Sequence, residues 1–154
     1  MAAKKSIRPK PAVRSRPEEA VYLELMRTLD MLSRGVTQVL KPADLSATQY
    51  NVLRILRGAP EGLPCGEIAD RMITRDPDIT RLLDRLEKRR FVARCRESKD
   101  RRQVLTRITP LGLQELAGLD VPVQQAHIRQ LGHLGRRRLQ ILAKLLRSCR
   151  HEAA

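Results

Sequence analysis

The sequence has no long hydrophobic run, because charged residues interrupt its apolar segments every few positions. A membrane-spanning helix needs roughly 18 or more consecutive apolar residues, so a membrane-spanning segment is excluded. The basic N-terminus also lacks the apolar core of a signal peptide. We therefore expect a cytoplasmic protein with no membrane partner.

Cysteine, histidine and aromatic residues are scarce. The three cysteines are widely spaced and form no C-x-x-C, which excludes a disulfide framework and a thiolate metal site; as free thiols we expect them to be buried. The three histidines follow residue 126 and accompany no nucleophile motif and no phosphate-binding loop. The sequence therefore predicts no enzyme, no metal site and no cofactor. The cysteines and histidines are Cys65, Cys95, Cys149, His127, His133 and His151.

Acidic residues are also few, 17 against 31 lysines and arginines, which gives a net charge of +14. Such an excess favours a polyanionic partner, with nucleic acid ahead of an anionic membrane surface. The length suits one domain with a real core. Residues 1–16 contain six lysines and arginines and no acid, a composition typical of a flexible basic arm.

Apolar residues recur every three or four positions over residues 17–40, which predicts a long helix there. Ser46 and Gln49 then have the spacing of a capping box, flanked by Leu45 and Tyr50 as a hydrophobic staple. We expect a second helix from this box to about Arg57. The following "GAPEGLP" is typical of a turn.

Two further helices, over 65–72 and 76–89, are separated by a short polar segment, which is the helix-turn-helix pattern. Thr74 or Asp76 is expected to cap the second of them, with Pro77 in its first turn. Ile79, Leu82, Leu83 and Leu86 fall on one side of this helix. The opposite, mostly cationic side carries Pro77, Arg81, Asp84, Arg85 and Lys88.

The period changes to two over residues 91–96 and 104–109, which predicts two strands of a hairpin. We expect residues 97–103 to form its exposed tip. Thr109 and Pro110 then begin a helix in which Pro122 is expected to cause a kink or break near Val121. The last helix carries an apolar stripe with no partner in so small a domain, and such stripes mark interfaces; it comprises Leu142, Leu145, Leu146 and Cys149.

This mostly α (α+β) organisation, with "DITRLLDRLEKRRFVAR" followed by "SKDRRQVLTRITPLG", resembles the MarR family of bacterial transcriptional regulators over roughly residues 18–150. The resemblance implies a winged helix-turn-helix at about 43–110 within a single domain over 17–150. It also implies dimerisation helices at about 17–40 and 110–150, and a homodimer on a palindromic operator in double-stranded DNA. We accordingly expect a transcriptional regulator, a repressor relieved by a small ligand.

In such a complex the helix over 76–89 would enter the major groove and the hairpin tip the minor groove. Arg81 and Arg85 suit guanine edges, and Thr74 and Thr80 suit phosphates or bases. The resemblance assigns the minor-groove contact to Arg102, which Asp100 can orient. The expected DNA-binding residues are Thr74, Pro77, Asp78, Thr80, Arg81, Arg85, Lys99, Asp100, Arg101 and Arg102.

Members of the family often bind small aromatic or phenolic anions, for which Tyr22 and Tyr50 are the candidate residues. Two positions depart from the family pattern. Asp78 places a carboxylate near phosphates, and Arg90 stands where the family usually has a glycine that eases a positive φ.

Two other functions remain open. A non-specific architectural DNA-binding protein would use the same charge, because phosphate contacts carry no sequence information. A thiol-based redox regulator would need a reactive cysteine, and Cys65, at the start of a helix where a thiolate is favoured, is the candidate.

Overall fold

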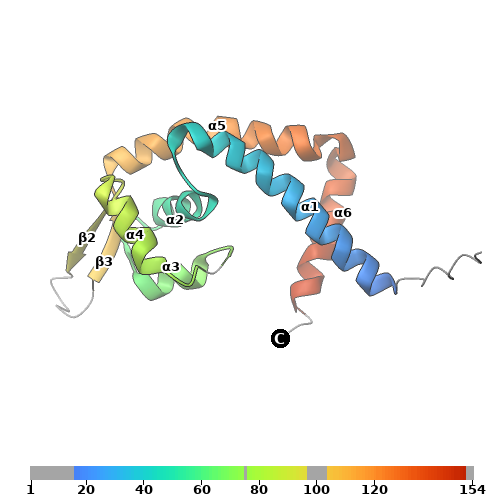
Figure 1. Cartoon of the computed structure of the whole chain (residues 1–154), viewed down its shortest axis with the longest axis horizontal. Helices are drawn as coiled ribbons and strands as arrows, with labels where there is room; N and C mark the ends of the chain where they lie inside the picture. Colours follow the sequence, from blue (N-terminus) through green and yellow to red (C-terminus); the bar gives the residue numbers. More distant parts are fainter. Residues whose placement is uncertain (1–15, 75, 97–103, 152–154) are drawn as a thin grey trace, which may run out of the picture. The chain divides into compact units, whose positions relative to one another are not determined.

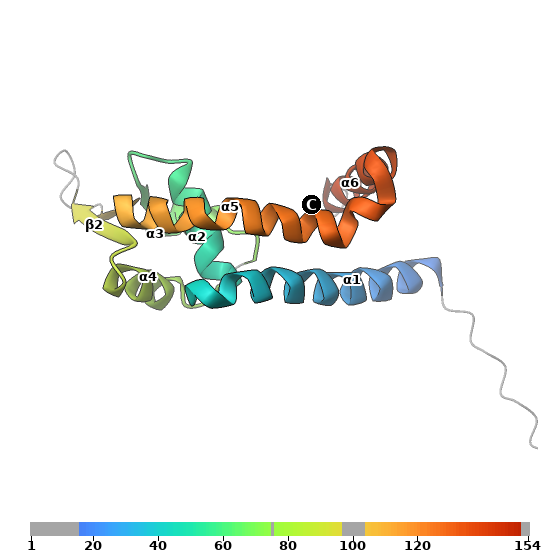
Figure 2. The ribbon, with the colours of Figure 1, turned by 90° about the horizontal axis from the view of Figure 1, so that it is seen from above.

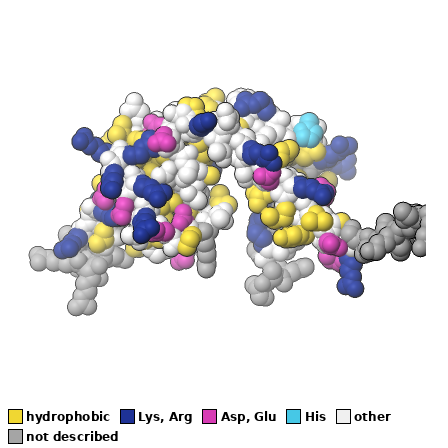
Figure 3. Space-filling view, in the orientation of Figure 1, with side chains coloured by type: hydrophobic (Ala, Val, Ile, Leu, Met, Phe, Trp, Pro, Cys, Tyr) yellow, Lys and Arg dark blue, Asp and Glu magenta, His cyan; other side chains and the backbone are white. Residues whose placement is uncertain are grey.

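The computed structural model describes residues 16–74, 76–96 and 104–151. The chain divides into two compact units, Met1–Met31 and Leu32–Ala154. Helix α1 (Pro17–Leu40) has the predicted bounds and begins with Glu18 and Glu19 in its first turn, where acids interact favourably with the helix dipole. In the first unit, α1 exposes large apolar side chains, seen as yellow surface in Figure 3: Val21, Tyr22, Leu23, Leu25, Met26, Leu29 and Met31.

The second unit begins with the end of α1 and continues through the short helix η1 (Lys41–Ala43) into α2 (Ala47–Arg57). The predicted capping box is confirmed: the Ser46 hydroxyl accepts from the Gln49 amide at 3.1 Å, and the Gln49 side chain accepts from the Ser46 amide at 2.9 Å. Leu45 and Tyr50 are both buried in the core. The entry into α2 therefore follows from its local sequence.

Helices α3 (Cys65–Arg71) and α4 (Ile79–Lys88) form the predicted helix-turn-helix. Strands β2 (Val92–Arg96) and β3 (Val104–Ile108) pair antiparallel, with Val92 opposite Ile108 and Arg96 opposite Val104. A third strand, β1 (Leu63–Pro64), was not predicted and pairs with β3, so the order is β1-β3-β2. Its two residues lie in the segment taken as a turn and are too few to show a period of two.

Helix α5 (Pro110–Leu131) begins as predicted, with the Thr109 hydroxyl accepting from the Gly112 amide at 3.0 Å. Of the kink or break expected near Val121, the break is wrong, because α5 continues through Pro122. Proline at this position removes one backbone hydrogen bond, but Leu119, Val123 and Ala126 are buried on the same face of the helix. Their packing keeps the helix intact.

Helix α6 (Gly135–His151) follows the short helix η2 (Gly132–Leu134). Within the second unit, α2, α3, α4 and the strands lie beside the N-terminal half of α5, whereas α6 lies beyond its C-terminal end (Figure 1 and Figure 2). The buried core is formed by α2, α3, α4 and the strands together with the end of α1 and the first half of α5, and it holds α4 and the hairpin in place. Its fully buried large side chains include Leu40, Leu53, Leu56, Ile68, Leu83, Leu86, Leu116, Val52 and Val92.

The connection from α4 to β2 uses a left-handed residue that is not glycine. Arg90 has φ 58, so the positive-φ turn is adopted and not avoided. The Arg90 amide donates to the Glu87 carbonyl at 2.8 Å, and the Thr109 hydroxyl donates to the Arg90 carbonyl at 2.6 Å. Gly112 is needed next to this turn, because a Cβ there would clash with the Phe91 carbonyl.

Candidate nucleic-acid interface

Helix α4 buries one side and exposes the other, as its sequence predicts. Leu82, Leu83 and Leu86 are at most 5% exposed. On the opposite side Arg81, Arg85 and Lys88 are exposed, and Asp84 is half-buried. Figure 3 shows dark blue side chains, with magenta acidic ones among them, over the part of the surface where α4 lies in Figure 1. The result is a cationic helix face of the kind that can enter a DNA groove.

The N-cap of α4 is Asp78, so the expectation of Thr74 or Asp76 is wrong. The Asp78 carboxylate accepts from the Arg81 amide at 3.3 Å, and the Asp76 carboxylate accepts from the Asp78 amide at 2.9 Å. Asp76 therefore holds the turn, and the helix begins three residues later than expected. Pro77 accordingly precedes the cap and does not lie in the first helical turn.

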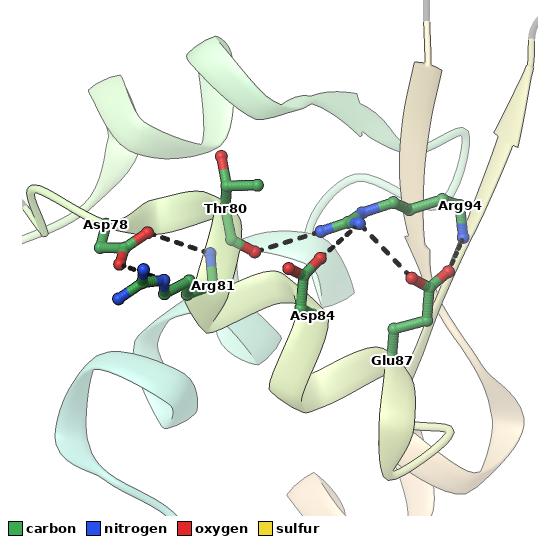
Figure 4. Close-up of polar contacts among 6 residues, drawn as sticks. All are labelled: Asp78, Thr80, Arg81, Asp84, Glu87 and Arg94. Atoms are coloured by element: carbon green, nitrogen blue, oxygen red, sulfur yellow. Dashed lines mark hydrogen bonds and ion pairs between the residues drawn. The ribbon is translucent and has the colours of Figure 1, made fainter.

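Asp78 also forms an ion pair with Arg81, with 3.2 Å between Oδ2 and Nε (Figure 4). This contact explains how a carboxylate can stand at the start of a helix with a cationic outer face, since its charge has a partner within the protein. The Arg81 side chain is 78% exposed. Its outer nitrogens thus remain available to a ligand while Asp78 restrains the side chain.

Asp84 does not pair with Arg81, although their spacing allowed that. It pairs with Arg94 of β2, with 2.6 Å between Oδ1 and Nη1. Arg94 also lies 3.5 Å from Glu87 Oε2, and its backbone amide donates to Glu87 Oε1 at 3.2 Å. The role of Arg94 has no signal in the sequence, because nothing in the spacing of a strand residue indicates which helix residue it will meet.

A second arginine ties the end of α4 to the segment between α1 and α2. Arg89 donates to the Asp44 carbonyl at 2.5 Å and to the Ala43 carbonyl at 2.8 Å. Its guanidinium also stacks 4.5 Å from the centre of the Phe91 ring, an attractive cation–π contact. Helix α4 is thus held at its C-terminal end as well as on its buried face.

The predicted threonines lie at the expected surface. Thr74 and Thr80 are exposed, and the Thr80 carbonyl accepts from Arg94 Nη2 at 3.3 Å. The two strands that were predicted on either side of the hairpin tip are present as β2 and β3. The tip residues Lys99, Asp100, Arg101 and Arg102 lie outside the described residues.

A groove of about 610 Å³ lies beside α4, between the end of α1 and the start of α2. Four cations and one acid are among its lining residues, so it suits a small anion. The lining comprises Thr37, Lys41, Asp44, Leu45, Ser46, Gln49, Arg85, Lys88 and Arg89.

The two tyrosines considered for ligand binding differ in environment. Tyr50 is only 7% exposed within the core, with the Arg54 guanidinium 5.8 Å from its ring centre. Burial raises the pKa of the Tyr50 hydroxyl. Tyr22, in the first unit, is 61% exposed. Neither residue lines the groove beside α4.

The cysteines are less buried than expected. Cys65 and Cys95 are half-buried and Cys149 is exposed, because α6 directs Cys149 away from any core. On the same helix Leu142 and Leu145 are 37% and 58% exposed, and Leu146 is half-buried. In the part of the chain that the structure describes, no three metal-ligating side chains gather, and no helix is long and apolar enough to cross a membrane.

A helix-turn-helix with a cationic outer face, joined to an antiparallel hairpin, defines a winged-helix DNA-binding protein. The MarR family model matches residues 45–104. A MarR transcription factor from Planctomyces limnophilus is 43% identical, with a TM-score of 0.67 over 86% of this chain and 96% of that one. The chain belongs to the MarR family.

Two further proteins are similar over most of their length. The HTH-type transcriptional regulator FarR of Neisseria gonorrhoeae is 28% identical over 82% of this chain and 86% of that protein. BpsR of Bordetella bronchiseptica, whose DNA binding is regulated by 6-hydroxynicotinic acid, has a TM-score of 0.78 at 22% identity, over 88% and 96% of the two chains. This protein is accordingly a DNA-binding transcriptional regulator and not an enzyme.

Proposed function

We propose that this regulator binds a palindromic operator as a homodimer, with α4 of each protomer in the major groove and the hairpin at the minor groove. One observation carries the proposal: α4 buries its leucines and presents Arg81, Arg85 and Lys88 to solvent. Residues 17–150 act as one domain, and residues 1–16 act as a basic arm ahead of it.

Each expected contact residue has a distinct role. Arg81 and Arg85 donate to guanine edges, since a guanidinium can bond O6 and N7 together. Thr74 and Thr80 bind phosphates, while Pro77 and Asp78 define where α4 begins. At the hairpin tip Arg102 enters the minor groove and Asp100 orients it, whereas Lys99 and Arg101 bind phosphates.

The homodimer is expected to form through the terminal helices. Large apolar side chains on the first half of α1 and on α6 are exposed in the single chain, among them Leu29, Leu142 and Leu145. Exposed apolar side chains on each of these helices are typical of an interface. Two recognition helices related by a dimer axis would read half-sites about 10 base pairs apart, or a multiple of that.

Selection of binding sites from random duplex DNA tests the proposal directly. We expect the selected sequence to be a palindrome, because such a result requires both sequence-specific binding and a two-fold symmetric dimer. Arg81→Gln and Arg85→Gln should each weaken binding to the selected site by about 1–3 kcal/mol and relax preference at one base position. Enrichment of no sequence would favour the architectural alternative.

The hairpin tip can be tested with three single variants on the selected operator at one salt concentration. Arg102→Ala should weaken binding by about 1–3 kcal/mol, and Lys99→Ala by less and equally on all sequences. The effect of Asp100→Ala shows whether this carboxylate acts by orienting Arg102 or only through its charge. It weakens binding if the carboxylate orients Arg102, and strengthens binding if only charge matters.

The arm should act through charge alone. Deleting residues 1–16 should lower affinity for all DNA sequences alike and flatten the dependence of log K on log salt, because six cations near DNA release counterions. An unchanged slope would show that the arm does not take part.

We further propose that a small aromatic or phenolic anion in the groove beside α4 relieves repression. The groove shares Arg85 with the DNA-facing side, so an anion there would compete with DNA for the same guanidinium. Benzoate should dissociate the operator complex, whereas uncharged benzyl alcohol at equal concentration should not. Lys41→Gln removes a groove cation away from the DNA-facing side of α4, and it should abolish the benzoate effect while preserving DNA binding.

Lys41→Gln also gives the result that would contradict a ligand site in this groove. If Lys41→Gln responds to benzoate as the original chain does, the ligand does not bind in this groove. Repression itself is tested with a reporter under the selected operator, where loss of the regulator should raise transcription. A fall would make the protein an activator.

A further inference from the structure

Arg94 connects the two parts of the molecule that are proposed to touch DNA. It lies on β2, yet its guanidinium reaches three residues of α4: the Asp84 carboxylate at 2.6 Å, the Glu87 carboxylate at 3.5 Å and the Thr80 carbonyl at 3.3 Å (Figure 4). Its backbone amide adds a bond to Glu87 at 3.2 Å. These contacts cover two turns of one helix face.

The geometry of these contacts restrains the strand in more than one direction. A guanidinium is planar and donates along fixed directions, so several acceptors spread along a helix fix its position and its orientation. The Arg94 side chain is only 26% exposed, which limits competition from water. A lysine at this position could keep the charge but could not reach three acceptors with fixed geometry.

The place of Arg94 in the sheet extends this restraint to the whole hairpin. Arg94 is the middle residue of β2 and pairs with Thr106 of β3, which is 2% exposed. Holding the centre of a two-stranded ladder against α4 fixes the direction in which both strands run onward to Arg96 and Val104. The direction of the hairpin and the direction of α4 are thereby set together.

The two acids that contact Arg94 carry the opposite charge to the one that DNA binding alone would favour. Asp84 and Glu87 are acids on the helix that is proposed to approach phosphates, and their side chains are 43% and 41% exposed. If electrostatic attraction were their only influence, removing either acid would tighten DNA binding. A positioning role predicts the reverse for operator DNA.

We propose that Arg94 is a positioning residue, held by Asp84 and Glu87, that sets the angle between the hairpin and α4 so that both enter neighbouring grooves of the operator at once. This inference rests on the proposed hairpin contact with the minor groove. It requires no contact between Arg94 itself and DNA.

The sign of the effect of Asp84→Asn is the sharpest test. On operator DNA we expect Asp84→Asn and Glu87→Gln to weaken binding several-fold, and Arg94→Ala and Arg94→Lys to weaken it about tenfold. On non-specific DNA the acid variants should bind equally well or more tightly. Asp70→Asn, at an exposed acid on α3 for which the described residues show no ion pair, is the matched charge control and should not weaken operator binding.

A double-mutant cycle with the hairpin tip separates positioning from folding. If Arg94 acts by directing Arg102, then Arg94→Ala should cost little in a chain that already carries Arg102→Ala, and the hydroxyl-radical footprint of Arg94→Ala should lose the flanking minor-groove protection while keeping the major-groove protection. Urea unfolding of each variant checks that the fold survives. Should Arg94→Ala fail to fold, Arg94→Lys and Asp84→Asn complete the same cycle.

Three results would overturn the inference, and they differ in whether the proposed function survives. Tighter operator binding by Asp84→Asn, or additive losses from Arg94→Ala and Arg102→Ala, would show that Arg94 does not position the hairpin, while the proposed function stands. A silent Arg102→Ala on an operator that the protein otherwise recognises would overturn the hairpin contact, and the inference with it.

Discussion

Helices α4 and α6 have the same kind of sequence and opposite environments. Both have leucines three or four residues apart and carry several arginines and lysines on the remaining positions. In α4 the three leucines are at most 5% exposed, whereas on α6 Ile141, Leu142 and Leu145 are 51%, 37% and 58% exposed. Apolar periodicity therefore shows that a helix has a face to bury, but not what covers it.

The difference comes from what surrounds each helix. Helix α4 contacts α2, α3 and β2, whose buried side chains form one core with its leucines. Helix α6 contacts the short helix η2 that precedes it. The apolar side of α4 is an internal feature of the winged helix, and the apolar side of α6 is part of the surface proposed for dimerisation.

The largest expected effect is the loss of a core leucine in α4. Leu83→Ala should lower the free energy of unfolding by about 2–5 kcal/mol, because the residue is 1% exposed and its removal leaves a cavity. Leu145→Ala on α6, studied at a concentration where the chain is monomeric, should cost less than about 1 kcal/mol. Urea unfolding followed by circular dichroism measures both, and equal losses would contradict the contrast between the helices.

The next effect concerns the interface. A Leu142→Lys and Leu145→Lys double variant should dissociate the proposed dimer, with each buried interface leucine contributing about 2 kcal/mol or more if it is a central contact. Light scattering should then give the mass of one chain while the circular dichroism spectrum is unchanged. A dimer that survives this change would place the interface elsewhere.

The N-cap of α4 should contribute less. Asp78→Ala removes the acceptor of the Arg81 amide and should destabilise the fold by about 1 kcal/mol. Asp78→Asn, which keeps a capping oxygen, is the matched control and should cost little. Thr74→Ala, at the cap position expected from sequence alone, should leave stability unchanged, and a thermal melt of the three variants ranks them.

Effects no larger than that of the N-cap should come from two of the positive-φ positions, Arg90 at the end of α4 and Gly135 at the start of α6. Arg90→Gly relieves a positive φ at a residue with a side chain and should stabilise the fold by about 0.5 kcal/mol, the difference between the left-handed cost and the flexibility of glycine. Gly135→Ala, where φ is 72, should destabilise by about 1 kcal/mol. Shifts of the denaturant midpoint in the same direction for both variants would contradict this prediction.

Features that depend on neighbours in the chain were predictable. The range of α1, the capping box of Ser46 and Gln49, and the start of α5 at Pro110 all follow from residues a few positions apart. The buried and exposed sides of α4 follow from the rotation of a helix by 100° per residue. Such patterns are encoded within one or two turns, so the sequence alone displays them.

Features that depend on two distant segments were not predictable. Strand β1 exists because Leu63 and Pro64 meet Thr106 and Leu105 of β3, and two residues show no pattern of their own. The break expected at Pro122 does not occur, because burial of neighbouring side chains outweighs one lost hydrogen bond. The cap of α4 moved to Asp78 because Asp76 holds the turn before it.

The sequence by itself determined a small basic protein with a helix-turn-helix, a charged hairpin and two apolar terminal helices, since periodicity, charge and capping are local properties. Only the tertiary structure decided which partners the charges find: Asp84 takes Arg94 from the hairpin in place of Arg81, and Arg89 takes the carbonyls of Ala43 and Asp44. An ion pair between distant residues depends on how a strand packs against a helix. That packing is set by the shared core, in which no single segment contains all the contacts.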